Sequence, residues 1–556
     1  MVNLKTNDTT KDDVITQDGQ PLLKGDYPYN IDGIGNSVYL DNDSSRSGTP
    51  NANKVGNVQW NSEKPKQNLD LSEMKRDGLS FWSISAYSLG HFNNDLVAGL
   101  GFTYQTYYLQ DVLKISQVVA GFTLLSGQIT DGITTPLIGM ASDSCNTRIG
   151  KRTPWYILGS ILVIPSFIGI FVDPGFEGSA QSAYYIILPA ILNVGWAFVQ
   201  ISNMSIVNSL TSSSQRRDKL ISLRNGFSYI ANVLVLAISL IVFATVKDQI
   251  LQFRILCLLL GAIGLCTSIF YIFSINEPLL TKQAKESQRE YLALARQQEL
   301  EDELDDDIDR DANPRTSSLM KAHISKWYMW LKEGQFYIYG MAYMLVRVAV
   351  NVTMTVQPFY LIYVTGFEKT EENPTPLSLA IVPLLSFITS MLFSIFLYKR
   401  IMNKFKNRQT VLLAAIVQIS IGSIPFILLT PNPNTRWLVY LISPIQGIGM
   451  AMMLNTATSC ISDVIGKSDG NSAFVYGAYG FFDKVANGVS LFYITAYLNT
   501  DPTALRWIIG LTPPLCAVGA FVACAIGQRK YSSRLAALSV QVQKRPKKNK
   551  DPYNNE

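Results

Sequence analysis

The sequence predicts an all-α membrane protein with twelve transmembrane helices arranged as two six-helix bundles. Two observations carry this prediction. Of the 556 residues, 48% are hydrophobic, and they gather in runs of about 20 between Leu79 and Gly527, the length that crosses a hydrocarbon core of about 30 Å. Charged residues make up only 16% of the chain, against about 25% in soluble proteins, and they lie mostly between the runs.

The chain begins with a polar segment, residues 1–79, which we expect to be a disordered cytoplasmic tail. It is rich in Asn, Asp, Ser, Gly and Lys, and such a composition buries too little apolar surface to fold alone. It has no basic stretch followed by an apolar one, so no cleavable signal peptide is predicted. Asp18, Leu22 and Leu23 fit the pattern of an acidic dileucine sorting signal, which makes a sorting adaptor a candidate partner.

Twelve apolar runs follow, six in a first bundle at residues 80–275 and six in a second at 335–528. The segment between them, 276–334, contains the acidic run EDELDDDIDRD, which predicts a solvated cytoplasmic loop. Residues 529–556 form a basic tail. Six plus six spans around a long central loop is the layout of a major facilitator. The predicted spans are 80–108, 116–141, 155–172, 183–208, 223–246, 252–274, 335–365, 376–398, 409–430, 437–463, 473–497 and 504–527.

The orientation follows from the loop charges, because Lys and Arg accumulate on the cytoplasmic side of a membrane. Basic residues recur in the loops after the second, fourth and eighth spans and in the C-terminal tail. The opposite loops hold mixed or acidic residues, such as Asp173 with Glu177. We therefore expect both termini and the central loop in the cytoplasm. The basic loop residues are Arg148, Lys151, Arg152, Arg216, Arg217, Lys219, Lys399, Arg400, Lys404, Lys406 and Arg408.

The composition argues against several other classes of protein. The six cysteines show no CxxC spacing, and all but Cys145 lie in apolar runs, so neither a disulfide framework nor a zinc site is predicted. Two histidines, His91 and His323, are too few for a His-rich metal site. No set of nucleophile, base and metal ligands indicates an enzyme. We expect no metal, no cofactor and no nucleic-acid partner.

Ionisable residues inside the spans are the candidate substrate or coupling groups. Each costs about 2.5–3.5 kcal/mol to insert and therefore usually faces a cavity or a partner. His91, Asn94 and Asp95 share one helix face through their spacing of three and four residues. Asp131 lies in the neighbouring span, with Thr135 four residues further on. The remaining candidates are Arg224, Arg347, Asp483 and Lys484.

Two interpretations of Asp131 and Lys484 are open. Two carboxylates in adjacent helices, with a lysine elsewhere, favour an ion-coupled cluster in which a proton on a carboxylate changes the preferred conformation. Alternatively, these groups, with Arg347 and Asp483 among them, form static salt bridges, for example Asp131 to Lys484, that only hold the two halves together.

The stretch 131–155 ends one helix, makes a short basic turn and begins another. Gly150 favours a tight turn beside Lys151 and Arg152, and Asp143 precedes it, which indicates a conformational gate. The alternative is that the basic residues only anchor the loop on the positive side of the membrane.

The residues DGITTPLIGMASD followed by GKRTPW resemble the loop motif of the glycoside-pentoside-hexuronide:cation symporter branch of the major facilitators. Within that branch, GHFNNDL in the first span and SAFVYGAYGFFDKVANGVSLF in the eleventh resemble eukaryotic lysosomal and melanosomal cysteine transporters. The resemblance covers the twelve-span core, 80–527, and implies a major facilitator fold.

The resemblance also implies roles for single residues. Asp95 and Asp131 fall where the symporters place acids for the substrate and the coupling cation. Lys484 falls on their eleventh-helix lysine and Arg224 on their fifth-helix arginine. For a small zwitterion such as cysteine, Arg347 or Lys484 could meet the carboxylate, and Asp95 or Asp131 the ammonium group.

Thr135 stands where the cation site would have its second carboxylate, which weakens a sodium site. Gln200 and Met204 replace the sugar-binding acid and tryptophan of the fourth span, so a sugar is not the expected substrate. We expect a secondary transporter that moves a small polar metabolite, cysteine, across an endolysosomal or vacuolar membrane by alternating access. Its expected partners are the small-molecule substrate, membrane lipid and, for coupling, the proton. The alternatives are a cation-coupled carrier of lysophospholipid or sugar-like solutes, a plasma-membrane location, and a non-transporting sensor or scaffold.

Overall fold

The computed structural model describes residues 79–211, 214–289, 293, 331–367, 369–370, 374–405, 408–465 and 472–543. The predicted sorting signal (Asp18, Leu22, Leu23), the acidic run and the RPKKNK segment lie outside these residues. Their roles stay predictions.

The described residues are almost entirely helical. In the first half the helices are α1 Phe81–Leu89, α2 Phe92–Leu100, α3 Gln117–Ser144, α4 Thr153–Phe171, α5 Gly178–Leu210, α6 Ser214–Thr245 and α7 Gln249–Ser274, with π-helical turns η2 Gly101–Gln105 and η3 Tyr108–Val112. In the second half they are α9 Gly334–Tyr363, α10 Ser378–Leu392, η5 Phe393–Leu397, α11 Tyr398–Phe405, α12 Arg408–Ser423, α13 Pro425–Leu428, η6 Arg436–Leu438, α14 Val439–Ile465, α15 Ser472–Tyr497 and α16 Pro502–Gln543.

Every predicted span corresponds to helix in the structure. Among the described residues, nine helices are long and apolar enough to cross a membrane. The first, second and eleventh spans are not among those nine, and they carry Asp95, Asp131 and Lys484. These three candidate charges therefore lie on the spans that are less regular or less apolar, whereas Arg224 and Arg347 lie on spans that qualify.

The structure differs from the sequence prediction at several places, including the following three. Residues 277–289, expected in the central loop, are helical. Helix α16 continues past 527 to Gln543, through a segment without Gly or Pro after Gly527 that includes the good helix formers Ala and Leu. The first span, expected to be continuous over 80–108, is interrupted at Gly90.

The break at Gly90 is held by side chains from other helices. The Tyr156 hydroxyl donates to the backbone oxygen of Gly90 at 2.8 Å, and the Asn203 amide donates to that of Tyr87 at 3.2 Å. A Cβ at position 90 would overlap Asn203 and the ring of Tyr271. The missing helical hydrogen bonds are thus replaced inside the protein, as a membrane span requires.

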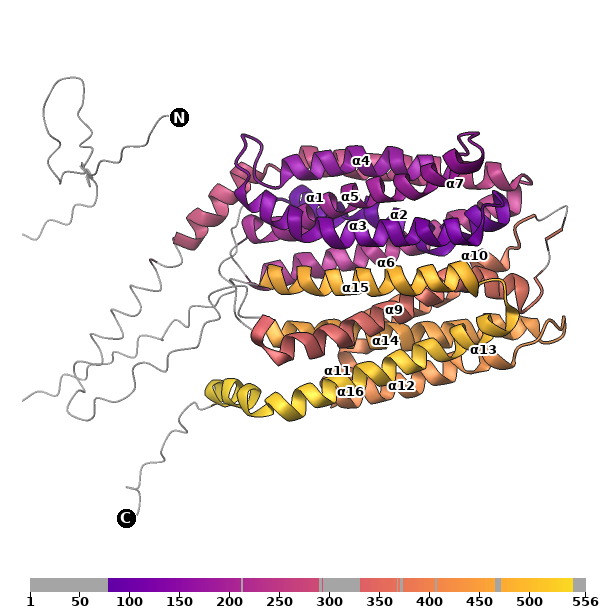
Figure 1. Ribbon diagram of the computed structural model, residues 1–556. Helices are drawn as coiled ribbons and strands as arrows, with labels where there is room; N and C mark the ends of the chain where they lie inside the picture. Colours follow the sequence, from indigo (N-terminus) through magenta and orange to yellow (C-terminus); the bar gives the residue numbers. More distant parts are fainter. Residues whose placement is uncertain are drawn as a thin grey trace, which may run out of the picture. The chain divides into compact units, whose positions relative to one another are not determined.

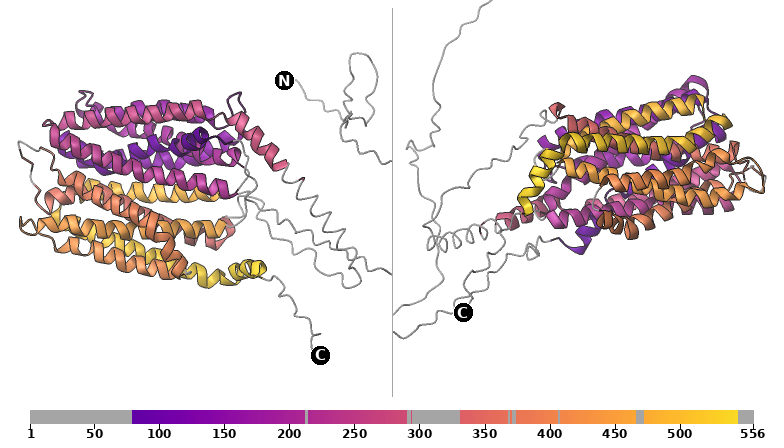
Figure 2. Two further views of the ribbon diagram at one scale, coloured as in Figure 1. Left: turned by 180° about the vertical axis from the view of Figure 1, so that it is seen from behind. Right: turned by 90° about the horizontal axis from the view of Figure 1, so that it is seen from below.

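The helices form two sets that lie on two sides of the molecule (Figures 1 and 2). Helices α1 to α7 pack mainly on one another, as do α9 to α16. The sets meet where α3 packs on α15 and α6 on α10. The candidate charges on α3 and α15 therefore lie at the boundary between the sets.

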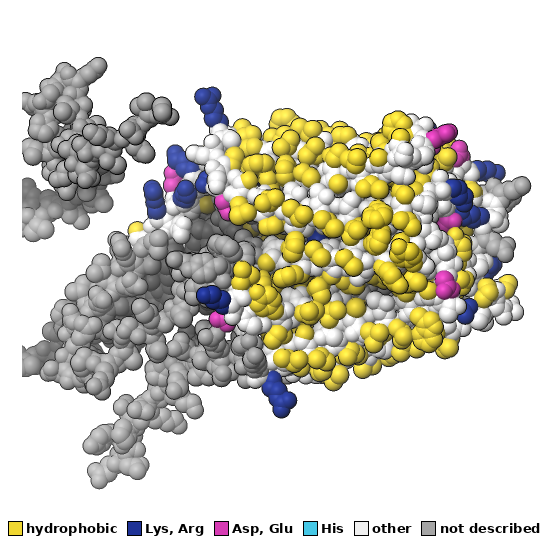
Figure 3. All heavy atoms as spheres, in the orientation of Figure 1, with side chains coloured by type: hydrophobic (Ala, Val, Ile, Leu, Met, Phe, Trp, Pro, Cys, Tyr) yellow, Lys and Arg dark blue, Asp and Glu magenta, His cyan; other side chains and the backbone are white. Residues whose placement is uncertain are grey.

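The outer surface carries an apolar band across the length of the helices, with charged side chains at its two ends (Figure 3). Large apolar side chains point outward within this band; Ile241 is 62% exposed and Leu515 is 63% exposed. Such a continuous exposed apolar surface fits contact with lipid.

Candidate functional site

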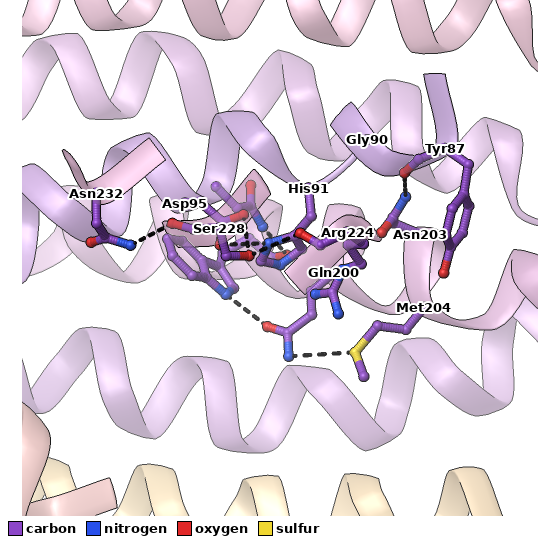
Figure 4. A network of polar contacts seen from close by, with 12 residues as sticks. Tyr87, Gly90, His91, Asp95, Gln200, Asn203, Met204, Arg224, Ser228 and Asn232 are labelled. Atoms are coloured by element: carbon purple, nitrogen blue, oxygen red, sulfur yellow. Dashed lines mark hydrogen bonds and ion pairs between the residues drawn. The ribbon is translucent and has the colours of Figure 1, made fainter. Parts of the chain in front are cut away.

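The first span supplies a buried histidine–aspartate pair. The break at Gly90 places His91 at the start of α2, and its Nδ1 lies 2.9 Å from Oδ1 of Asp95, one turn further on. The other carboxylate oxygen of Asp95 accepts a hydrogen bond from the Ser228 hydroxyl of α6 at 2.8 Å. Figure 4 shows these three side chains gathered together. Asn94, predicted on the same face, turns to α5 and donates to the backbone oxygen of another residue, Trp196.

A ladder of side chains four residues apart on α5 continues from this pair. Trp196 Nε1 donates to Gln200 Oε1 at 2.8 Å, and Gln200 Nε2 lies 3.9 Å from the thioether sulfur of Met204. The ring of His91 meets Trp196 edge-on, with 6.2 Å between the centroids. Sequence reasoning missed Trp196, although an indole N–H in an apolar span needs a polar partner. It also missed Ser228.

Arg224 of α6 is the cation of this cluster that stays unpaired. In the part of the chain that the structure describes, it takes part in no ion pair, and its buried Nε donates no hydrogen bond. Figure 4 shows Arg224 beside His91, with its guanidinium toward Gln200 and Met204. An unsatisfied buried donor costs about 1–3 kcal/mol, and more when it is charged, so the position favours an anionic ligand.

Asp131 and Lys484 form an ion pair across the boundary between the two sets. Lys484 Nζ of α15 lies 2.6 Å from Oδ2 of Asp131 on α3, and the Thr135 hydroxyl donates to the other oxygen at 2.9 Å. Asp131 is fully buried. The ammonium group also lies 5.8 Å from the centre of the Trp196 ring, which links this pair to the α5 ladder.

The neighbouring acid on α15 serves a different contact. Asp483 Oδ2 accepts from Arg347 Nε of α9 at 3.2 Å, and Asn487 Nδ2 lies 2.5 Å from its Oδ1. All three residues belong to the second set of helices. The prediction grouped Arg347 and Asp483 with the substrate and coupling residues; the structure places them in a separate pair.

The predicted gating residues divide between a surface pair and a buried turn. Arg152 pairs with Asp143 and also donates to Ser142, which ties the end of α3 to the start of α4. Lys151 contributes a backbone N–H, as described next.

Glu277, expected in a solvated loop, is instead buried beneath the turn. Its carboxylate accepts the backbone N–H groups of Lys151, Arg152 and Thr153 at 2.9–3.1 Å and the Thr153 hydroxyl at 2.9 Å. A carboxylate at a helix N-terminus satisfies free N–H groups and complements the helix dipole. Gly150 has φ 118°, and a Cβ there would overlap Glu277. The turn therefore needs both residues.

A cavity of about 60 Å³ lies among η2, α3, α4 and α5. Its polar lining includes Gln105, Gln128, Asn193, Trp196 and Lys484. This volume corresponds to roughly four water molecules at about 15 Å³ each, so the cavity adjoins the site and is too small for a metabolite.

The two sets are tied together at the end of the bundle that lies away from Gly150. Tyr104 donates to the backbone oxygen of Leu379 at 3.0 Å, and Gln249 to that of Pro374 at 2.6 Å. The side chain of Thr375 is held by Gln249 at 3.3 Å and also by Gln252. These contacts close one end of the protein.

An ion pair reinforces the same end. Lys369 Nζ lies 3.7 Å from Asp111 Oδ1 and 5.3 Å from the centre of the Tyr107 ring. The Tyr363 hydroxyl also donates to Asp111 at 3.2 Å. Burial lowers the pKa of the Lys369 ammonium, and the Asp111 carboxylate acts in the opposite direction.

Within the described residues, no group of three His, Cys, Asp or Glu side chains could hold a metal ion. Thr135 supplies a hydroxyl beside Asp131. The ligands around Asp131 are therefore few for a hard cation, which prefers six or more oxygen atoms.

The chain matches one protein family and resembles several individual proteins. The family described as MFS/sugar transport protein matches residues 86–300 and 310–501. Major facilitator superfamily domain-containing protein 12 of Mus musculus is 30% identical over 452 residues, which are 77% of this chain and 87% of that protein. Sodium-dependent lysophosphatidylcholine symporter 1 of Mus musculus is 23% identical over 462 residues, covering 77% and 79% of the two chains.

Two solved structures share the fold. The nucleoside transporter NupG has a TM-score of 0.54 at 14% identity, covering 80% of this chain and 99% of its own. The xylose transporter XylE from E. coli, in a partially occluded inward open conformation, has a TM-score of 0.53 at 14% identity, covering 79% and 94%. These neighbours confirm the predicted major facilitator fold.

Proposed function

This chain belongs to the family described as MFS/sugar transport protein and is a secondary transporter rather than an enzyme; we propose that it moves a small zwitterion, cysteine, across an endolysosomal membrane. Transport proceeds by alternating access and is coupled to a proton.

The observation that carries the substrate class is the unpaired Arg224 beside the Asp95 carboxylate (Figure 4). A guanidinium binds a carboxylate through two parallel hydrogen bonds, so Arg224 receives the carboxylate of the substrate. The sequence had offered Arg347 or Lys484 for this role, but both are engaged in ion pairs with acids of this chain.

The ammonium group of the substrate would meet Asp95, whose two oxygens are oriented by His91 and Ser228. Gln200 and Met204 lie beside the Arg224 guanidinium (Figure 4). A thioether is polarizable and adapts to irregular shapes, which suits a thiol side chain better than a sugar ring, since a sugar requires paired hydrogen-bonding acids.

The proton acts at Asp131. Its ion pair with Lys484 joins α3 to α15 across the two sets, and these helices must move relative to each other when the closed end opens. A proton on Asp131 removes the charge that attracts Lys484 and so frees the two helices. A ligand that binds one conformation better than the other shifts the balance between them.

The test is uptake of labelled cysteine into vesicles containing the purified protein, with Arg224→Gln compared with Arg254→Gln, an exposed arginine on α7. A lost charge-assisted contact of about 1.5–3 kcal/mol raises KM for cysteine about 10- to 100-fold in Arg224→Gln only. Cysteamine, which lacks the carboxylate, should compete poorly with labelled cysteine for uptake by the wild-type protein.

Other outcomes would direct the function elsewhere. Equal KM values for the two variants would remove Arg224 from the substrate site. Sodium-dependent uptake of lysophosphatidylcholine without cysteine uptake would favour an amphiphile carrier. If neither cysteine nor lysophosphatidylcholine is taken up, although a cooperative thermal unfolding transition shows that the protein is folded, the sensor or scaffold would be favoured.

A further inference from the structure

A second polar cavity, of about 250 Å³, lies where α5 ends and α6 begins. It is covered by the helix at residues 277–289, the pink helix at the upper left of Figure 1. The transport mechanism above does not use this cavity. Its polar lining residues are Ser209, Thr211, Arg217, Thr281, Lys285 and Gln288.

The described lining of the cavity is positively charged. Among the described residues, the lining includes Arg217 and Lys285 and no carboxylate. The Nε donor of Arg217 is buried and bonds to no atom of the described residues. Glu286, next to Lys285 in the sequence, forms an ion pair with Lys282, with 3.9 Å between Lys282 Nζ and Glu286 Oε1. An anion with several acceptor oxygens would therefore complete this site.

The position along the helices favours an anion at the membrane surface. Helix α5 ends at Leu210 and α6 begins at Ser214, and the sequence around this junction, TSSSQRRDK at 211–219, is polar and mostly basic in charge. The cavity residues lie where the apolar runs give way to basic residues, as at the surface of a membrane. Leu279, on the covering helix, is an apolar side chain 51% exposed, as expected beside lipid. Basic pockets at this level bind phosphorylated headgroups.

We propose that this cavity binds a phosphate monoester, held by Arg217 and Lys285 with hydroxyl donors from Ser209 and Thr281. The ligand is either the phosphorylated headgroup of an inositol lipid or a soluble phosphate. This site is separate from the cluster at Asp95 and Asp131 and does not depend on the identity of the transported substrate.

The helix at residues 277–289 connects the cavity to the turn at residues 150–153, which contains most of the predicted gating residues. Glu277, the first residue of this helix, accepts the backbone N–H groups of Lys151, Arg152 and Thr153. A phosphate that joins Lys285 to Arg217 fixes this helix against α5 and α6, and so fixes Glu277 under the turn. Occupancy of the cavity therefore changes the rate of transport.

The test measures binding to the full-length protein in nanodiscs. The probes are a phosphatidylinositol bisphosphate, phosphatidylserine at matched charge, soluble inositol trisphosphate and inorganic phosphate. Arg217→Gln and Lys285→Gln should each weaken binding about tenfold, the effect of one lost charged contact, and Lys282→Gln on the outer side of the same helix should not. Arg217→Lys should retain partial binding, which separates loss of the site from loss of the fold.

The four probes distinguish a lipid headgroup from a soluble phosphate, and two outcomes would contradict the proposed site. Binding of the inositol lipid alone assigns a headgroup, whereas binding of inositol trisphosphate or phosphate assigns a soluble ligand. Equal affinity for phosphatidylserine, or unchanged affinity in Arg217→Gln and Lys285→Gln, would contradict the site. Because binding is read without transport, these outcomes stand even if cysteine is not the substrate.

Discussion

Replacing Asp131 by Asn and Lys484 by Gln, singly and together, separates a coupling role from a static strut. The charges meet at 2.6 Å, with the Asp131 side chain fully buried and that of Lys484 13% exposed. Removing one partner of a buried ion pair costs about 3–5 kcal/mol, because the other charge remains unpaired. Each single variant should lose about this much stability. The double variant should lose less than the sum, by about 2 kcal/mol.

Thermal unfolding in detergent measures the stability of the two single variants and the double variant. Vesicle uptake measures their coupling to the proton. The double variant should exchange cysteine at equal pH on the two sides, because neither remaining group is charged. It should not accumulate cysteine when a pH gradient is imposed, since the carboxylate that takes the proton is gone. The control is the neutral pair Arg347→Gln with Asp483→Asn, within one set of helices, which should retain the response to pH.

Two results would contradict the role given to the Asp131–Lys484 pair. Strictly additive losses of stability would mean that Asp131 and Lys484 do not interact in the folded protein. Accumulation of cysteine by the double variant to the wild-type level under a pH gradient would leave the pair as a strut and remove the proton from Asp131.

Gly90→Ala should destabilise the protein by about 1–3 kcal/mol, because the new methyl group meets Asn203 and Tyr271. An unchanged midpoint of thermal unfolding would contradict the close packing at the break between α1 and α2. Glu277→Gln should lower stability by about 1.5–3 kcal/mol, since the charged acceptor of the α4 N-terminus is lost, and a variant as stable as wild type would show that the turn does not need it. Gln249→Ala combined with Thr375→Val should open the closed end. A cysteine introduced there should then react faster with an impermeant thiol reagent, and equal rates would exclude these contacts as a latch.

The spans could be predicted because apolar length is a local property of the sequence. The third span, predicted at 155–172, is α4 at Thr153–Phe171. The break at Gly90 could not be found in this way. It depends on hydrogen bonds from Tyr156 and Asn203, which are distant in sequence and adjacent only in the fold.

The candidate site was predictable where its contacts are local. His91 and Asp95 are four residues apart, and helical spacing alone places them together. The contact of Asp95 with Ser228 spans 133 positions, and periodicity carries no information on it. Glu277 was assigned to a solvated loop because acids between spans usually are. The signal that could have found it is its place directly before a proline, Pro278, right after an apolar span.

Under the proposed function, cysteine moves together with a proton through this carrier. The most direct test of this coupled movement is a pH-sensitive dye sealed inside vesicles that contain the wild-type protein, read while cysteine is added outside at equal starting pH. Coupled movement should acidify the vesicle interior as cysteine is taken up, and this acidification should be lost in Asp131→Asn. Cysteine uptake without any movement of protons would contradict it.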